Sequence, residues 1–463
     1  MKINNKIKLL IYLLILIIVS SFFLINSIIG KEDSFTNLKS LLNKEQKKTI
    51  KRYIFPYKFI ADQKQTISKQ QKATNRILSE LELKTKNVGN DIGITESNIK
   101  LSNNKSLKKY YLNSGFYYGI NNISPGSGYI DFFENKIFIL SSRGVLAFTK
   151  NLTDNEVRFK QIKNNINDFI DLKQFEKEKW FSLKDILIFK NQVFVSYTEE
   201  VEEDCWNTSV VSGKINLENI QFKKFFSSKE CIHSKNNIDK EFNAHQSGGR
   251  IAAFDDNHIL LSTGDYRSRH LAQYKESVNG KIIKINIDNN DYEIVSMGHR
   301  NAQGLYFDKE NNFILETEHG PMGGDEINLI EVNEINKFKI LNYGWPIASY
   351  GEHYGGKANY NKKKYEKYPL YKSHSEYGFI EPLKYFASAI GISEIVKIKK
   401  NKYVFSSLKD HSLYFFELNK VKKIFNLERI EVFERIRDLR FHDNKLYLFL
   451  EDTASIGVID LYE

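Results

Sequence analysis

The residues of this chain best suited to chemistry gather between Gly298 and Pro346. Two predicted strands, Gly304–Phe307 and Phe313–Thr317, are separated by a polar turn and flanked by Gly, Arg, Asn, His and acidic residues. Strands of a core do not need such flanks, whereas loops that carry polar groups from strand ends to a shared centre do. The stretch therefore indicates a binding or catalytic centre. An ordinary turn-rich hairpin is the alternative.

Four motifs in this stretch resemble, in order, the glucose/sorbosone dehydrogenase family, the soluble pyrroloquinoline quinone (PQQ)-dependent aldose dehydrogenases. They are Arg300-Asn301-Ala302-Gln303-Gly304, Glu318-His319-Gly320-Pro321, Asp325-Glu326-Ile327-Asn328 and Asn342-Tyr343-Gly344-Trp345-Pro346. Ala302 stands where the family has proline. The resemblance is good over residues 240–463 and weaker over residues 110–240. It implies a six-bladed β-propeller that uses PQQ and Ca²⁺ to oxidise an aldose-type sugar, or a similar alcohol, at the anomeric carbon by hydride transfer.

The resemblance also implies roles for single residues. His245, in Asn243-Ala244-His245-Gln246-Ser247-Gly248-Gly249-Arg250, corresponds to the general base, and Asp265 to the carboxylate that orients it. A lone histidine before a strand is otherwise more often structural. Arg300 corresponds to the residue that stabilises negative charge on the quinone. The cofactor-binding residues implied are Arg300, Asn301, Lys409, Arg435, Arg437 and His270.

Calcium ligands are implied in the same way. Gly320 and Pro321 correspond to carbonyl donors for the calcium ion at the quinone, and carbonyl oxygens suit this hard cation. Asp325, Glu326 and Tyr343 complete the implied metal ligands, and the last two correspond to a second, structural calcium site.

The chain departs from the family pattern near the expected site. Trp180-Phe181-Ser182-Leu183-Lys184 stands where the family has a Gly-rich glutamine loop. The double glycine Gly248-Gly249 changes the register by one residue relative to some relatives. Arg267, Arg269 and His270 replace smaller or amide residues. The sugar pocket of the family therefore does not carry over to this chain.

Short alternating or apolar runs recur beyond Leu112 and are separated by turns rich in Asp, Asn, Gly and Lys. The runs are Ile137–Leu140, Val145–Phe148, Ile186–Phe189, Val193–Tyr197, Ile259–Ser262, Ile282–Ile285, Tyr403–Phe405, Leu413–Phe416 and Leu446–Leu450. Many short strands at near-regular spacing predict an all-β fold. A sandwich or barrel of roughly 350 residues would be unusually large, so four-stranded blades around an axis fit better.

The two cysteines, Cys205 and Cys231, flank two predicted strands, Ser209–Ile215 and Ile220–Phe226. Antiparallel pairing of these strands would bring their outer ends together. In an exported domain this arrangement predicts a disulfide. Two unrelated buried thiols are the alternative.

The N-terminus has the pattern of a membrane segment. Leu9 to Ile29 carries no charge and follows three lysines, which favours an uncleaved signal anchor (residues 1–30) with the rest of the chain outside the cytoplasm. A cleaved signal peptide is the alternative. Residues 31–108 read as a basic linker with possible helices at Lys44–Ile60 and Ser68–Leu83, and residues 109–463 as the propeller.

Charge distribution argues against nucleic-acid binding. The formal net charge is +11, yet residues 31–110 alone carry 18 Lys and Arg against 8 Asp and Glu, so the basic excess lies outside the predicted propeller. The prediction is therefore a membrane-tethered or secreted sugar dehydrogenase of the periplasm with an unidentified electron acceptor. The rival interpretation is a catalytically inactive propeller that binds a glycan or protein partner in the cell envelope. A nicotinamide enzyme is excluded because no strand–GxGxxG–helix unit is present.

Overall fold

A computed structural model describes residues 17, 20–21, 59–60, 62–67, 70, 74, 91–92, 94–101, 105–112, 127–149, 152, 158–170, 174, 182–335 and 340–461. The chain divides into two compact units, Met1–Lys72 and Ala73–Glu463. Within the described ranges, no helix has both the length and the apolar character needed to cross a membrane. Most of the predicted anchor and of the two predicted linker helices lies outside these ranges.

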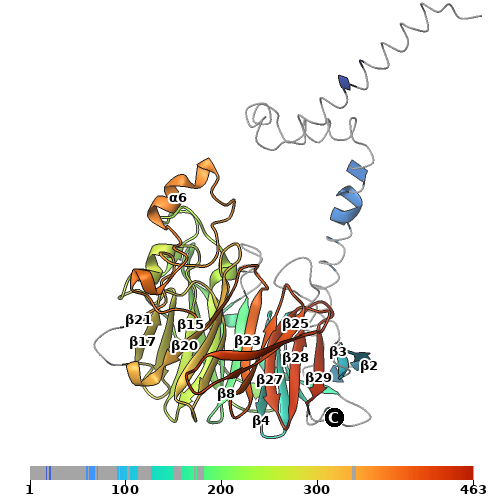
Figure 1. The fold of residues 1–463 in the computed structure, drawn as a ribbon. Helices are drawn as coiled ribbons and strands as arrows, with labels where there is room; N and C mark the ends of the chain where they lie inside the picture. The colour runs from blue at the N-terminus through green and yellow to red at the C-terminus, as the bar shows by residue number, and fades with distance from the viewer. Residues whose placement is uncertain are drawn as a thin grey trace, which may run out of the picture. The chain divides into compact units, whose positions relative to one another are not determined.

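The second unit is a six-bladed β-propeller, as predicted (Figure 1). Blade one contains β4 (Gly128–Phe133), β5 (Lys136–Ser141), β6 (Leu146–Thr149), β7 (Phe159–Asn164) and β1 (Asp91–Ile92). Blade two contains β8 (Leu183–Phe189), β9 (Gln192–Glu202), β10 (Cys205–Lys214), β12 (Lys223–Phe226) and β13 (Ile232–His233). Blade three contains β14 (Gly248–Asp255), β15 (His258–Thr263), β16 (Lys281–Asn286), β17 (Tyr292–Met297) and β21 (Leu341–Asn342). A short strand, β11 (Asn219–Ile220), pairs with β7.

The other three blades complete the ring. Blade four contains β18 (Ala302–Asp308), β19 (Phe313–Glu318), β20 (Asp325–Glu331) and β22 (Lys384–Phe386). Blade five contains β23 (Ile392–Lys399), β24 (Lys402–Ser407), β25 (Ser412–Leu418) and β26 (Ile424–Glu431). Blade six contains β27 (Ile436–His442), β28 (Lys445–Leu450), β29 (Ser455–Asp460), β3 (Ser106–Leu112) and β2 (Ile94–Lys100). The innermost strands β4, β8, β14, β18, β23 and β27 each pack against the next, and β27 meets β4.

The last blade joins both ends of the propeller sequence, because β3 pairs with β29 along five residues. This differs from the predicted linker, which extended to residue 108: β1, β2 and the start of β3 lie inside that range. The lysines in Leu107-Lys108-Lys109 hide the alternation of a strand. Leu107 and Lys109 are both buried, and Lys109 forms an ion pair with Glu434.

A buried ion network ties the innermost strands together at the axis. Arg250 of β14 lies 3.2 Å from Asp185 of β8, 2.9 Å from Asp438 of β27 and 3.3 Å from Glu394 of β23. Arg440 contacts the same three carboxylates. Asp185 and Asp438 also accept backbone N–H groups from the next blade, at Ile251 and Ile130. Four blades are therefore cross-linked through charges that are almost fully buried.

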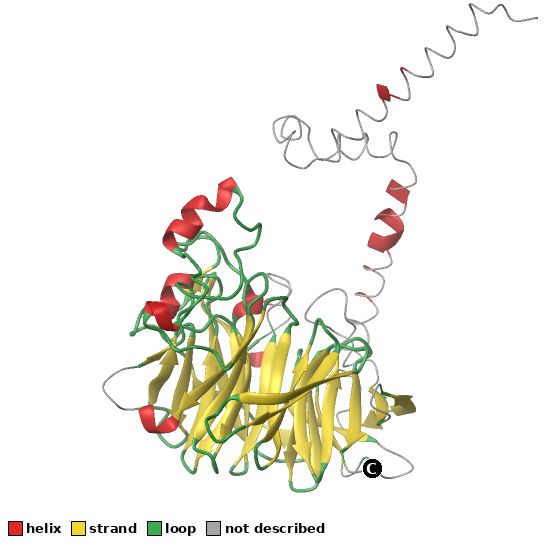
Figure 2. Cartoon of the chain, in the orientation of Figure 1, coloured by secondary structure: helices red, strands yellow, loops and turns green. Residues whose placement is uncertain are grey.

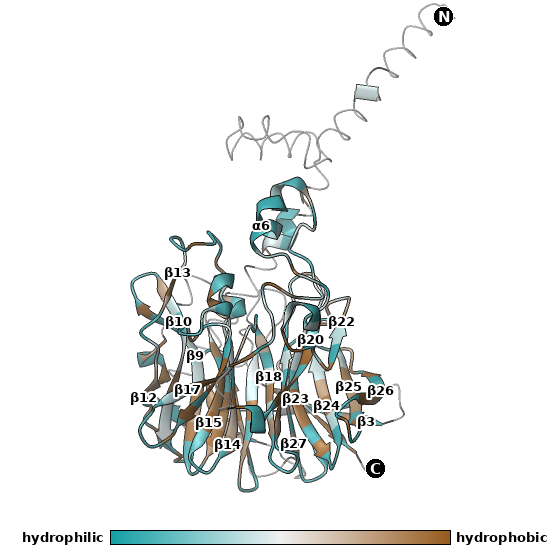
Figure 3. Ribbon diagram, turned by 60° about the vertical axis from the view of Figure 1, so that its left-hand side comes forward, coloured by the Kyte–Doolittle hydropathy of each residue, from teal (hydrophilic) through white to brown (hydrophobic). Residues whose placement is uncertain are grey.

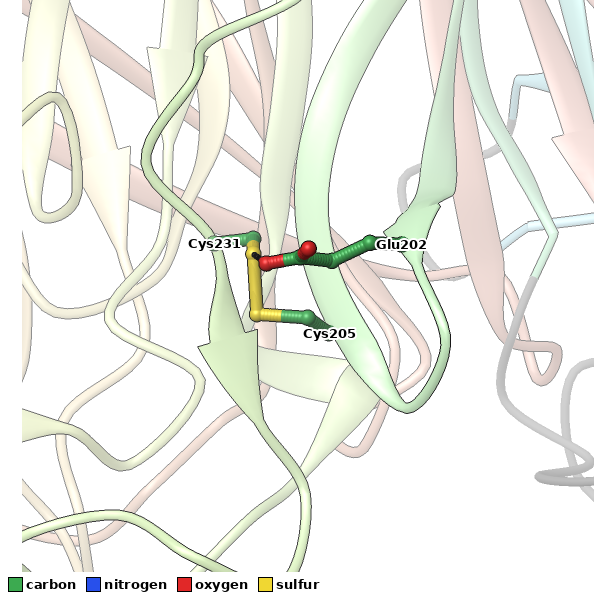
Figure 4. Close-up of side chains that lie close together, drawn as sticks. All are labelled: Glu202, Cys205 and Cys231. Carbon is green, nitrogen blue, oxygen red and sulfur yellow. Dashed lines mark hydrogen bonds between the residues drawn. A yellow bond between two sulfur atoms is a disulfide. The ribbon is translucent and has the colours of Figure 1, made fainter.

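The predicted disulfide is confirmed. Cys205 begins β10, and Cys231 precedes β13, which pairs with β10 opposite Cys205. The two cysteines are bonded, with Cα atoms 5.2 Å apart. Figure 4 shows Glu202 beside the bond, its carboxylate 3.5 Å from the Cys231 sulfur. Because both sulfurs are bonded to each other, neither is available as a thiolate metal ligand.

The described helices of the propeller unit are short and lie in connections between strands (Figure 2). They are α6 (Lys362–Lys367) and the 3₁₀ helices η2 (Ile166–Asp168), η3 (Ala244–Gln246), η4 (Arg269–Gln273), η5 (Val332–Glu334), η6 (Asn359–Asn361) and η7 (Ser375–Tyr377). Figure 3 shows apolar segments concentrated in the strands, whereas α6 is hydrophilic. The long connection between β21 and β22 carries α6 and is held by Asp239, which accepts hydrogen bonds from Lys367 and Tyr368.

Candidate active site

The N-terminal ends of the innermost strands surround a cavity of about 110 Å³. Its walls are formed by Tyr129, Lys184, His245, Gly248, Asn301, Gln303, His319, Leu408, Arg435 and Arg437. Tyr129, Lys184, Gly248, Gln303 and Arg437 are each the first or second residue of an innermost strand. The propeller therefore gathers side chains from positions 129 to 437 at one end of its axis.

His245 is positioned by the loop that enters blade three. It lies in η3, and its backbone N–H donates to the side chain of Asn243 at 2.8 Å. Burial, followed by the charges of Lys184 and Arg437, lowers the pKa of His245 to about 2. The lowered pKa keeps the imidazole neutral but also makes it a weak base. A negative charge bound beside it would raise the pKa towards the working pH, where a general base is most effective.

Asp265 is fully buried, and both of its carboxylate oxygens accept hydrogen bonds. Its Oδ2 accepts a hydrogen bond from the Trp345 indole at 2.8 Å, and its Oδ1 accepts one from the Arg267 backbone at 2.9 Å. With its amide turned, Gln246 also donates to Asp265 at 3.1 Å. None of these hydrogen bonds between described residues reaches the His245 ring. The orienting role of Asp265 toward His245 stays a prediction.

Arg300 and Asn301 enter from the start of blade four. Asn301 lines the cavity and accepts the Gly248 N–H at 3.1 Å. Arg300 is buried beside the Trp345 ring, and its Nη1 donates to the carbonyls of His319 and Gly320 at 2.8 and 2.7 Å. Its Nε has no hydrogen-bond acceptor among the described residues. Arg300 therefore retains donor capacity close to the cavity.

Two arginines that are predicted to bind the cofactor, Arg435 and Arg437, line the cavity from blade six. Glu451 pairs with Arg435 at 2.9 Å and with Arg437 at 2.7 Å. Burial opposes ionisation of Glu451, but the two guanidinium charges outweigh it and lower the pKa to about 2. The arginines are thus fixed in place by one carboxylate that they share.

Two predicted cofactor residues lie elsewhere. Lys409 is exposed and does not line the cavity, where its neighbour Leu408 stands instead. His270 lies in η4 with its Nδ1 3.0 Å from Asp239, so it belongs to the contacts that hold the connection carrying α6. Side-chain direction and the course of long loops decide such positions, and neither follows from a motif.

One of the two carbonyls predicted to hold calcium at the quinone, and the predicted metal ligand Asp325, already accept hydrogen bonds. The Gly320 carbonyl accepts the hydrogen bond from Arg300. Asp325 accepts four backbone N–H groups, from Gly320, Ile390, Gly391 and Ile392. Asp325 therefore fastens the entry to blade five to blade four. A cation at the Gly320 carbonyl would share this oxygen with the Arg300 guanidinium.

Glu326 belongs to a buried acidic cluster that also contains Glu316 and Glu318. Burial and the charge of Glu318 raise the pKa of both Glu316 and Glu326 well above the usual range. Glu316 Oε1 and Asn328 Oδ1 have no hydrogen-bond donor among the described residues, and a cavity of about 10 Å³ lies at Glu318 and Glu326. Tyr343 lines this cavity, although its hydroxyl donates to the Leu329 carbonyl at 2.6 Å.

Several cavity residues were not assigned from the sequence. Gln303 and His319 stand inside the quoted motifs, and Tyr129 and Lys184 belong to the weakly matching blades. Lys184 had a usable signal, because the charged pair Lys184-Asp185 interrupts the otherwise apolar run from Leu183 to Phe189. Arg250 ends the His245 motif, but no role was assigned to it from the sequence. Its Nε and Nη2 donate to the carbonyls of Gln303 and Arg437, both at 2.6 Å.

Solved structures similar to this chain share its fold. A crystal structure of glucose dehydrogenase matches with a TM-score of 0.56 and 23% identity, covering 73% of this chain and 96% of that one. The apo form of the soluble aldose sugar dehydrogenase of Escherichia coli matches with a TM-score of 0.55 and 20% identity, covering 72% of this chain and 95% of that one. The PQQ-bound aldose sugar dehydrogenase of Streptomyces coelicolor matches with a TM-score of 0.52 and 16% identity, covering 73% of this chain and 99% of that one.

Sequence comparison adds relatives of known and unknown activity. An uncharacterised protein of Synechocystis is 30% identical over 42% of this chain, which spans about half of that relative's length. The aldose sugar dehydrogenase YliI of E. coli is 25% identical over 57% of this chain and 71% of its own length. The quinoprotein glucose dehydrogenase B of Acinetobacter calcoaceticus is 33% identical over 25% of this chain and 29% of its own length. Residues 187–459, more than half of the chain, match the family described as Glucose / Sorbosone dehydrogenase. The chain therefore belongs to the glucose/sorbosone dehydrogenase family.

Proposed function

We propose that this protein oxidises an aldose-type sugar, or a similar alcohol, at the anomeric carbon with PQQ bound in the cavity at the propeller axis. The donor set of the cavity supports this. PQQ is a tricarboxylate, and Arg435, Arg437 and Asn301 present cationic and amide donors from two blades. Relatives described as aldose sugar dehydrogenases and quinoprotein glucose dehydrogenase support the substrate class.

The residues divide the work as follows. His245, neutral and facing the cavity, accepts the hydroxyl proton of the sugar on an imidazole nitrogen. Arg300 stabilises negative charge that grows during the reaction, and Arg435 and Arg437 hold carboxylates. When bound, PQQ supplies the acceptor for the hydride.

The observation that carries the proposal is a neutral histidine held beside two arginines in one cavity. The test is dye reduction by the purified protein, supplied with PQQ and Ca²⁺, over a panel of aldoses. We expect reduction that requires both PQQ and a sugar. Binding of PQQ or of glycans without dye reduction by any aldose would favour the inactive propeller.

We also propose that the acidic cluster of Glu316, Glu318 and Glu326 holds a structural Ca²⁺ ion. The Glu316 Oε1 atom, which has no hydrogen-bond donor among the described residues, and the small cavity at Glu318 and Glu326 suit a hard cation. An ion that binds the folded state alone stabilises that state. At 100 times its dissociation constant, Ca²⁺ should raise the free energy of unfolding by about 2.7 kcal/mol. Thermal unfolding with Ca²⁺ and with a chelator measures this, and Glu326→Gln should abolish the difference. Glu310→Gln, an exposed acid on the turn between β18 and β19, is the control. Equal unfolding with ion and chelator would contradict the site.

The propeller is further proposed to lie outside the cytoplasm, on the inner membrane through an uncleaved anchor or secreted. The lysine-led apolar run and the Cys205–Cys231 disulfide support this location. A C-terminal reporter that is active only in the cytoplasm should therefore be silent, and unreduced peptides should contain the two cysteines linked. An active reporter, or free thiols in the native protein, would contradict export.

A further inference from the structure

Lys184 is a residue of the cavity wall to which the proposed reaction gives no task. It is the second residue of β8 and only 7% exposed. Its Nζ lies 3.4 Å from the carbonyl of Ala244, the residue before His245. The amine therefore lies beside the predicted base, at the boundary between blades two and three.

The next blade makes room for the stem of this lysine. Gly249 has a φ of +110°, and a Cβ at that position would come within 2.4 Å of the Lys184 Cβ and 2.9 Å of its Cγ. Only glycine accepts both the backbone conformation and the close approach. The register of β14 shifts at this point, between Gly248 and Ile251. The second glycine and the lysine both depart from the family pattern, and the structure brings them into contact.

Keeping an amine at this place is costly for the cofactor-free protein. Burial, and then the charge of Arg437, lowers the pKa of Lys184 to about 7. Lys184 also lies among other cationic groups of the cavity wall, since Lys184 and Arg437 both act as positive charges on His245. A buried, disfavoured cation in a cavity is typical of a ligand-binding residue.

We propose that Lys184 is a further cofactor-binding residue, whose ammonium pairs with a carboxylate of the anionic cofactor. The inference rests on the proposed function, since the cofactor is PQQ. An entering carboxylate would offset the repulsion from Arg437 and accept a charge-assisted hydrogen bond from the ammonium. Lys184 thus adds blade two to the residues of blades four and six that hold the acids of the cofactor.

The test compares Lys184→Met with the wild type. Methionine keeps the length and the apolar stem of the side chain but removes the charge. We expect the dissociation constant for PQQ, measured by fluorescence titration of the cofactor-free protein, to rise roughly tenfold to a hundredfold. The thermal midpoint of the cofactor-free protein should stay the same or rise, because a buried charge has been removed. Lys223→Met, an exposed lysine of the same blade, should change neither value.

The outcomes separate this inference from the proposed function. If the wild type binds PQQ and Lys184→Met binds it equally well, the inference fails and the function stands. A lower thermal midpoint together with unchanged affinity would make Lys184 a structural residue and would also overturn the inference. If Lys184→Met does not fold, Lys184→Gln is measured in its place with the same expectations. A wild type that binds no PQQ would overturn both proposals.

Discussion

Replacing His245 with glutamine is expected to lower turnover by roughly two to four orders of magnitude, the scale of losing a general base. Glutamine keeps a polar side chain of similar reach but cannot accept the hydroxyl proton. Cofactor affinity should change little, because the cationic groups of the cavity carry most of it. The measurement is the turnover number of the PQQ-loaded variant over a range of sugar concentrations, beside its PQQ dissociation constant.

The control is His258→Gln. His258 begins β15, at the other end of the hairpin that follows His245, and pairs with Asp255 at the surface. This variant should keep wild-type turnover. If His245→Gln turns over as fast as the wild type while binding PQQ, another group is the base, and the residue assignment fails even though the enzyme stands.

Replacing Arg250 with methionine is expected to reduce the free energy of unfolding by about 3–5 kcal/mol, the usual cost of removing one partner from a buried ion network. Asp185, Asp438 and Glu394 would then face Arg440 alone. The backbones of Gln303 and Arg437 would also lose their hydrogen bonds to the Arg250 side chain. Denaturant unfolding of the cofactor-free protein measures the change.

Arg429→Met is the matched control for this experiment. Arg429 also pairs with a carboxylate, that of Asp410 at 2.7 Å, but its side chain is 43% exposed. An exposed pair of this kind contributes about 0–1 kcal/mol. If both variants lose equally little stability, the axial network does not hold the blades together.

The strand pattern and the motifs together were sufficient to predict the fold and part of the cavity wall. His245, Asn301, Arg435 and Arg437 meet in the cavity, as the motifs indicated, because each stands at the start of an innermost strand or just before one. The disulfide was predictable for a similar reason, since a hairpin's geometry follows from its strands. Such local signals need no knowledge of the distant parts of the chain.

Features that depend on contacts between distant segments could not be predicted. Lys108 and Lys109 gave β3 the composition of a linker, and its pairing with β29, more than 300 residues away, makes it a strand. Asp265 and Trp345 are 80 residues apart, so nothing in either motif shows that the carboxylate bonds to the indole. Asp325 was predicted as a metal ligand, whereas in the structure it accepts four backbone N–H groups. Three of these donors come from residues 390–392, and nothing in the Asp325 motif shows that this segment lies beside it.

The most direct test of the central claim is a titration of the purified, cofactor-free protein with PQQ, followed by tryptophan fluorescence. The centre of the Trp345 ring lies 5.3 Å from the guanidinium of Arg300, whose neighbour Asn301 lines the cavity, so we expect a bound quinone to quench the tryptophan fluorescence. If the cavity binds the cofactor, this titration shows saturable binding of one PQQ per chain with a dissociation constant at or below about 1 μM. We also expect binding at least tenfold weaker in Arg437→Ala, which removes a charge-assisted contact from the cavity wall. No binding of PQQ by the wild type at micromolar concentrations would contradict the account.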